Sequence, residues 1–217
     1  MGSVLVEKKE YLNIVNAVDF IKKNSNAKFD ESIDVAVNLN IDPKKTEQSI
    51  RGTLVLPNGN GTKKRILVIC NPGDEDKCKK NGADYAGSDD IIEKIKGGWT
   101  DFDLIVTVPS MMGKVGQLGK ILGPKGLMPN PKTGGITNDL EKTLKEIKKG
   151  RIELKNDSYG ILHNCIGKKS FDNDKIIENF NFYITSVNKL RPSTVKGIFI
   201  KKVSISTTMG RGVFVNL

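Results

Sequence analysis

A stretch rich in glycine and lysine, residues 113–136, is the part of the sequence best suited to lie against an anion. It holds seven glycines, three prolines and four lysines in 24 residues, and no acidic residue lies between Asp103 and Asp139. Glycine lets the backbone approach another group closely, and lysine supplies positive charge. The pattern indicates contact with a nucleotide or a nucleic acid, or else a rigid turn that serves only local packing. The four lysines of this basic surface are Lys114, Lys120, Lys125 and Lys132.

The known nucleotide-binding and catalytic motifs are missing from the sequence. A phosphate-binding P-loop needs Ser or Thr after its Gly-Lys pair, whereas Val115, Ile121 and Lys169 follow the three Gly-Lys pairs here. The dinucleotide fingerprint GxGxxG is also absent after Cys70, where the chain reads NPGDED. No Ser-His-Asp order or His-rich metal spacing occurs. We therefore expect a protein that is not an enzyme and needs no cofactor or metal.

A second candidate site is the sequence STTMGRG at residues 206–212, which follows Lys201 and Lys202. Hydroxyl groups can bind ribose 2′-OH groups and phosphates, and such contacts recognise folded RNA by its shape. The plain alternative is an ordinary turn at the end of a strand.

Charge and composition favour an anionic partner. The net charge is +10 and the isoelectric point about 9.4, which predicts attraction to nucleic acid or an anionic membrane surface. No apolar run of 18 residues exists, so we expect no membrane span. The three cysteines form no CxxC pair, which favours reduced thiols in the cytoplasm. No acid follows Glu178, so the surplus of positive charge is concentrated in residues 150–217 and in the glycine-lysine stretch.

The elements that must position these residues fall into three parts. Residues 11–23 have helical periodicity, and residues 32–40 alternate as a half-buried strand, with 51–56 as a second strand. The middle part alternates strands at 65–70, 83–86 and 102–108 with helices at 74–81, 88–97 and 139–149, which is typical of an α/β sheet. The last part predicts strands at 151–154, 160–166, 197–207 and 213–215, and a helix at 172–190 that ends before Pro192.

The two flanks need each other to form a core. Residues 1–58 and 150–217 are each short for a stable domain, but together they make one α+β domain. Residues 59–149 are then an inserted α/β domain, joined by two adjacent chain crossings that allow hinge motion.

Six sequence blocks, taken together, resemble one family. They are KFDESIDVAVNLNIDPKK from Lys28, RGTLVLP from Arg51, GADYAG from Gly82, GWTDFD from Gly98, LGKILGPKGLMPNPKTGG from Leu118 and TTMG from Thr207. In order and spacing they are similar to the bacterial ribosomal protein L-one family, and the resemblance covers nearly the whole chain. It implies a split RNA-binding domain formed by both termini, with an inserted Rossmann-like three-layer α/β domain.

The resemblance also implies the function and the site. It implies a protein of the large ribosomal subunit, in the cytoplasm, that binds large-subunit rRNA in the mobile lateral stalk and helps to release deacylated tRNA from the exit site. Repression of the protein's own mRNA is a further implied role, and an RNA-binding regulator acting mainly off the ribosome is the alternative. Other ribosomal components are implied partners, and the protein is expected to be a monomer outside the ribosome. The rRNA-binding residues that it implies are Lys28, Phe29, Gly167, Lys168, Thr207, Thr208, Met209 and Gly210, with the glycine-lysine stretch as a secondary basic surface.

Overall fold

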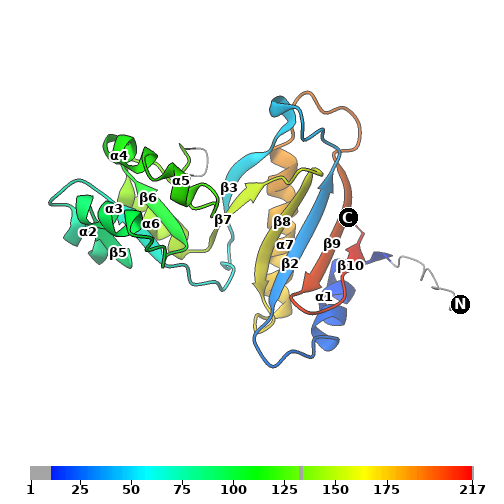
Figure 1. Cartoon of the computed structure of the whole chain (residues 1–217). Helices are drawn as coiled ribbons and strands as arrows, with labels where there is room; N and C mark the ends of the chain where they lie inside the picture. The colour runs from blue at the N-terminus through cyan, green and yellow to red at the C-terminus, as the bar shows by residue number, and fades with distance from the viewer. Residues whose placement is uncertain (1–10, 132–133, 217) are drawn as a thin grey trace, which may run out of the picture. The chain divides into compact units, whose positions relative to one another are not determined.

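The computed structural model describes residues 11–131 and 134–216 (Figure 1). Lys132, one of the four lysines of the glycine-lysine stretch, lies outside the described residues. The described chain divides into two compact units. The split unit takes the residues up to Ile50, residues 56–60 and the residues from Leu154 onward. The inserted unit takes residues 51–55 and 61–153.

The split unit is built on a five-stranded sheet with the strand order β1-β10-β9-β2-β8. The strands are β1 (Tyr11–Leu12), β2 (Ser32–Leu39), β8 (Ile161–Lys168), β9 (Ile200–Thr207) and β10 (Val213–Val215). All neighbours are antiparallel except β1 and β10, which are parallel. Two helices, α1 (Ile14–Lys23) and α7 (Asn173–Lys189), pack together against the sheet (Figure 1). A short 3-10 turn, η1 (Thr46–Gln48), follows β2.

The sheet of the split unit has one buried and one open face. Along β2, four apolar side chains are buried: Ile33, Val35, Val37 and Leu39. The intervening residues, Ser32, Asp34, Ala36 and Asn38, are only partly buried. This strict alternation follows from the two-residue period of a strand. The helices cover the apolar face, so the other face of β2 presents small and polar side chains.

Asn179 of α7 ties residues 56–60 into the split unit. Its side chain is fully buried. Its Oδ1 accepts a hydrogen bond from the Asn58 N–H at 3.1 Å, and its Nδ2 donates to the carbonyls of Gly59 and Ile166 at 2.9 and 2.8 Å. A buried amide needs such partners, because an unpaired one costs about 1–3 kcal/mol.

The inserted unit is a three-layer α/β structure. Its parallel strands, in the order β5-β4-β6, are β4 (Ile66–Ile69), β5 (Tyr85–Gly87) and β6 (Leu104–Thr107). The helical elements are α2 (Glu75–Lys80), α3 (Asp89–Lys96), η2 (Pro109–Met111), α4 (Met112–Gly116), α5 (Gly119–Leu122) and α6 (Leu140–Lys148). One apolar core joins the sheet to the side with α3, α4 and α5, and a second joins it to α2 and α6. The predicted fold class, with α+β and α/β parts, is confirmed.

The structure differs from the prediction at the start of the first helix, and it shows what the glycine-lysine stretch forms. Tyr11 and Leu12 form the short strand β1 beside β10, and the helix begins only at Ile14. The glycine-lysine stretch forms the short helices α4 and α5, whose Val115, Leu118 and Leu122 are fully buried in the core of the inserted unit. Where the chain crosses between the units, β3 (Arg51–Val55) and β7 (Arg151–Lys155) pair as a two-stranded sheet.

Candidate nucleic-acid interface

The turn after β9, residues 207–210, is fixed to the first residue of β2. The Gly210 N–H donates to the Thr207 carbonyl at 3.2 Å and closes the turn. The Thr208 hydroxyl oxygen accepts a hydrogen bond from the Ser32 N–H at 3.0 Å and lies 3.4 Å from the Ser32 carbonyl, to which it donates. Thr208 therefore holds the turn in place through contacts within the protein.

Glu31 is a buried carboxylate behind this turn, and sequence reasoning missed it. Its side chain is 0% exposed. It accepts hydrogen bonds from the Ser25 hydroxyl and, at 2.9 Å, from the Met209 N–H. The bond from Ser25 first, and then that from Met209, lower the pKa of this carboxyl from 4.5 to about 2. Glu31 thus stays ionised and anchors the backbone of Met209.

Two large apolar side chains stand exposed beside this anchor. Phe29 is 53% exposed and Met209 is 76% exposed, and Lys28 is exposed next to Phe29. Met209 is held through its N–H by Glu31, which follows Phe29 by two residues. Exposed apolar groups on a firmly held backbone suit contacts with ribose faces and bases of RNA.

Gly210 is required at its position by close packing. A Cβ atom on Gly210 would lie 2.1 Å from Oγ1 of Thr207. Thr207 itself is 2% exposed, so its side chain supports the turn from beneath. Of the four TTMG residues, Thr208 and Met209 are the ones with exposed side chains.

Lys168 and Gly167 of β8 reach the same end of the sheet. Lys168 pairs with Ser32, and its Nζ donates to the Ser32 hydroxyl at 2.7 Å. Gly167 is opposite Ile33. A Cβ atom added to Gly167 would lie 3.3 Å from the ring of Phe171. The structure therefore brings all eight residues of the predicted rRNA site close to the start of β2, from three separate stretches of sequence.

The open face of the sheet extends from this site as a polar groove of about 280 Å³. The groove is lined by Asp34, Val35, Ala36, His163, Asn164, Cys165, Ser204 and Ser206. Burial raises the pKa of the Asp34 carboxyl, while the nearby Lys168 ammonium opposes that shift. Most side chains that line this groove are small or polar.

The lysines of the glycine-lysine stretch are partly engaged within the inserted unit. Lys114 pairs with Asp89 at 2.6 Å, and Lys125 donates to the Thr100 hydroxyl at 2.6 Å. Lys120 is exposed. With its apolar residues buried and two of its lysines bonded, the stretch is first of all a covering layer for the parallel sheet.

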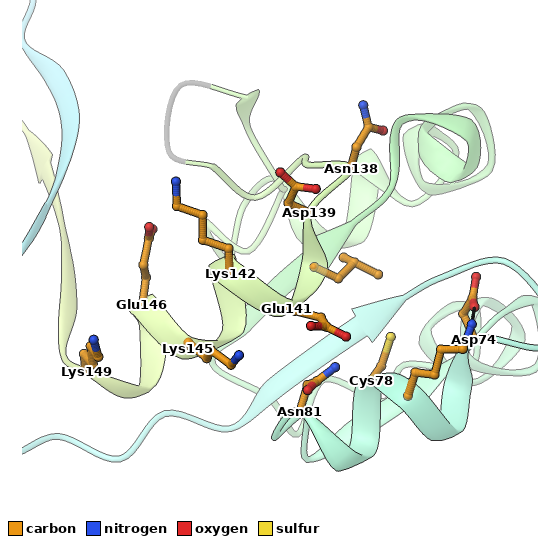
Figure 2. A pocket seen from close by; sticks show the side chains of 12 residues that line it. Asp74, Cys78, Asn81, Asn138, Asp139, Glu141, Lys142, Lys145, Glu146 and Lys149 are labelled. Atoms are coloured by element: carbon orange, nitrogen blue, oxygen red, sulfur yellow. Dashed lines mark hydrogen bonds and ion pairs between the residues drawn. The ribbon is translucent and has the colours of Figure 1, made fainter.

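A groove of about 710 Å³ between α2 and α6 was not expected from the sequence (Figure 2). In Figure 2, Glu141 and Lys145 of α6 point toward α2. The charged residues that line this groove are Asp74, Asp139, Glu141, Glu146, Lys77, Lys142, Lys145 and Lys149. Equal numbers of acids and lysines give this groove no preference for a phosphate group. Within residues 11–131 and 134–216, no three His, Cys, Asp or Glu side chains are placed to hold a metal ion.

The geometry defines a two-unit α/β protein whose split unit presents the exposed side chains of Phe29 and Met209 beside a hydrogen-bonded turn. Residues 21–211 match the ribosomal protein L1p/L10e family. The chain is 48% identical to the large ribosomal subunit protein uL1 of Bacteroides thetaiotaomicron, over 96% of this chain and 90% of that protein. It is 46% identical to the proteins of the same name from Lactobacillus acidophilus (96% and 90% covered) and Porphyromonas gingivalis (97% and 91% covered).

The chain belongs to the ribosomal protein L1p/L10e family. This membership confirms the family predicted from the sequence blocks, and it confirms that the protein is not an enzyme. Among the helices that the structure describes, none combines the length and apolarity needed to cross a bilayer.

Proposed function

We propose that this protein is a structural component of the large ribosomal subunit in the cytoplasm and that its split unit binds large-subunit rRNA. Family membership supports the first part. The observation that carries the second is the convergence of Phe29, Met209 and Lys168 on the start of β2, around the buried carboxylate of Glu31.

The recognition that we infer depends on shape more than on charge. The groups offered to RNA are two exposed apolar side chains, a rigid turn, the exposed Lys28, and Lys168, which is already bonded to Ser32. A rigid surface loses little conformational entropy on binding, which leaves more of the contact energy as affinity. RNA backbone and ribose groups, held in one folded shape, are the partner that fits such a surface.

The test is the Kd for a large-subunit rRNA fragment. Replacing both Phe29 and Met209 by Ala should weaken binding by about tenfold or more, because stacking of a base on an aromatic ring such as that of Phe29 contributes ~1–3 kcal/mol. Thr208→Ala should weaken it too, since it releases the turn from Ser32. The matched control is Phe20→Ala on α1, a side chain that is 39% exposed and belongs to none of the predicted site residues. An unchanged Kd for the double variant would show that the site is elsewhere.

We further propose that the protein helps to release deacylated tRNA from the exit site. The chain passes between the units only after residues 50, 55, 60 and 153, close to the paired strands β3 and β7. Connections by a few single chain segments are the kind that permits relative motion of domains. The measurement is the rate of tRNA dissociation from ribosomes with and without the protein. Equal rates would contradict this role.

A repressor of its own mRNA is the second candidate function. A site that reads shape accepts any RNA with the same fold, so an mRNA segment that mimics the rRNA element would compete for it. Sedimentation of cell extracts distinguishes the roles: protein in large subunits supports the ribosomal role, and monomeric protein bound mainly to mRNA supports the regulator acting off the ribosome.

A further inference from the structure

Two exposed apolar side chains lie at the end of the sheet away from the turn at residues 207–210, called the Thr208 turn below. Tyr159 is 81% exposed and Ile198 is 75% exposed. Among the large apolar side chains that the structure describes, only Met209 is comparably exposed, and Met209 belongs to the proposed rRNA site. Neither Tyr159 nor Ile198 contributes to the predicted site or to a core.

Both side chains are carried by loops that are hydrogen-bonded to neighbouring residues at the end of β2. The Leu39 N–H donates to the Gly160 carbonyl at 3.0 Å, and the Asn40 N–H donates to the Phe199 carbonyl at 2.7 Å. Tyr159 and Ile198 each precede one of these anchored residues. Figure 1 shows the loop before β9, in orange, at the arrowhead end of β2, and the red turn after β9 at the other end. The eight residues of β2 separate the two ends by about 23 Å.

The loop with Tyr159 is a tightly bonded turn. Oδ1 of Asp157 accepts hydrogen bonds from the N–H groups of Tyr159 and Ile161, both at 2.8 Å. Gly160 has φ +77°, and a Cβ there would lie 3.0 Å from the Ile41 side chain. The turn therefore presses against the end of β2 and directs Tyr159 outward.

The loop with Ile198 is held by Arg191. The guanidinium donates to the carbonyls of Val195 and Gly197, each at 2.9 Å from Nη2. Val195 and Phe199 on either side of Ile198 are 6% and 4% exposed. Ile198 is thus exposed between two buried anchors, on a loop with a fixed backbone.

The charge around this surface is positive. Lys196 and Lys201 are exposed close to Ile198 in sequence, and Lys155 is exposed four residues before Tyr159. No acid follows Glu178. The acids of the adjoining turns, Asp42 and Asp157, accept hydrogen bonds from backbone N–H groups of their own turns. The combination of an aromatic ring on a fixed backbone, a second exposed apolar side chain on the loop at the other side of β2, and exposed lysines matches the way single-stranded RNA is bound.

We propose that Tyr159 and Ile198 form a second RNA-binding surface, on which an unpaired base of an RNA segment stacks while the lysines neutralise its phosphates. This surface extends the proposed function, because it lies at the opposite end of the sheet from the proposed rRNA site. It rests on RNA as the partner, but not on the contacts of Phe29 and Met209.

The test uses a short oligouridylate that contains 5-iodouridine. The Kd of this oligouridylate for the full chain is measured at low salt by fluorescence anisotropy. It should rise about tenfold for Tyr159→Ala. It should stay within about twofold for Tyr159→Phe, because stacking needs the ring and not the hydroxyl. Phe182→Ala is the matched control, because that ring is 43% exposed on α7. An unchanged Kd for Tyr159→Ala would overturn the proposal.

Photo-crosslinking locates the bound base. The crosslink should map to Tyr159, and a crosslink confined to Phe29 or Met209 would overturn the proposal. The Kd for the rRNA fragment should be the same for Tyr159→Ala and wild type. A negative result for the Tyr159 surface therefore does not affect the test of the rRNA site at the Thr208 turn. In assembled subunits, a photoreactive residue in place of Ile198 should crosslink to RNA, and a crosslink to protein alone would overturn the assignment of the partner.

Discussion

The Thr208 turn and the glycine-lysine stretch differ in how strongly their composition suggests RNA binding and in which side chains they expose to solvent. The stretch has four lysines and no acid in its sequence, yet Lys114 and Lys125 are bonded to neighbours and Leu118 is buried. The turn has no charge of its own, yet it presents Met209 on a backbone fixed by Glu31.

On the proposal that RNA binds at the turn, this difference explains why composition alone locates a contact surface poorly. Lysine side chains are long and find local partners, and exposed ion pairs contribute only about 0–1 kcal/mol. A fixed backbone with exposed apolar side chains offers binding energy at a low entropic cost. We therefore expect substitutions at the turn to affect RNA binding far more than substitutions in the stretch.

The largest expected effect is that of Gly210→Ala. Its Cβ would lie 2.1 Å from Thr207 Oγ1, and because Thr207 is buried the turn must move. Overpacking of this kind costs ~1–3 kcal/mol, so we expect the Kd for the rRNA fragment to rise about thirtyfold.

Gly212→Ala is the matched control for that variant. A Cβ on Gly212 would meet nothing within 4 Å, so its Kd should equal that of the wild type. Equal affinities for Gly210→Ala and Gly212→Ala would mean that the turn does not need its present shape to bind RNA.

A smaller effect, dependent on pH, is expected for Glu31→Gln. The pKa of Glu31 is about 2 in the folded protein, against 4.5 for an unperturbed carboxyl. A lowered pKa stabilises the fold at pH values above 4.5, and this stability is lost as the pH falls toward 2. The urea midpoint of the wild type should therefore exceed that of the variant above pH 4.5, and the difference should shrink below it.

Glu47→Gln, which replaces an exposed carboxyl, serves as the control for the pH experiment. Its urea midpoint should follow that of the wild type at every pH. If the gap between wild type and Glu31→Gln stayed constant down to pH 2, the carboxylate would not be the anchor of the turn.

Local sequence patterns predicted most of the fold. The alternation from Ile33 to Leu39 gave β2 its buried face, and short apolar runs gave the parallel strands of the inserted unit. The error at Tyr11 has a physical cause. Its spacing fits a helix, but its ring packs on Phe214 with centroids 5.6 Å apart, and a contact between such distant residues leaves no trace in local periodicity.

The site was predicted only in part, for the same reason. Phe29 and the TTMG turn came from the resemblance to a family, whereas Glu31 was overlooked. Its partner Met209 is 178 residues away in sequence, so only the fold reveals the bond. The one local signal was an acid directly before a strand and after the exposed Lys28-Phe29 pair, a pattern that is common at strand ends.

The smallest effect is expected for the triple variant Lys114→Gln, Lys120→Gln, Lys125→Gln. If the stretch mainly covers the parallel sheet, the Kd for the rRNA fragment should change by less than about twofold. The steepness with which log K falls as log salt rises should also be nearly unchanged. Each lost phosphate contact would reduce that steepness by about 0.7–0.9. The double variant Lys28→Gln, Lys168→Gln in the split unit should reduce that steepness by about one to two. A fall of two or more for the triple variant would place phosphate contacts on the stretch and make the inserted unit a partner in rRNA binding.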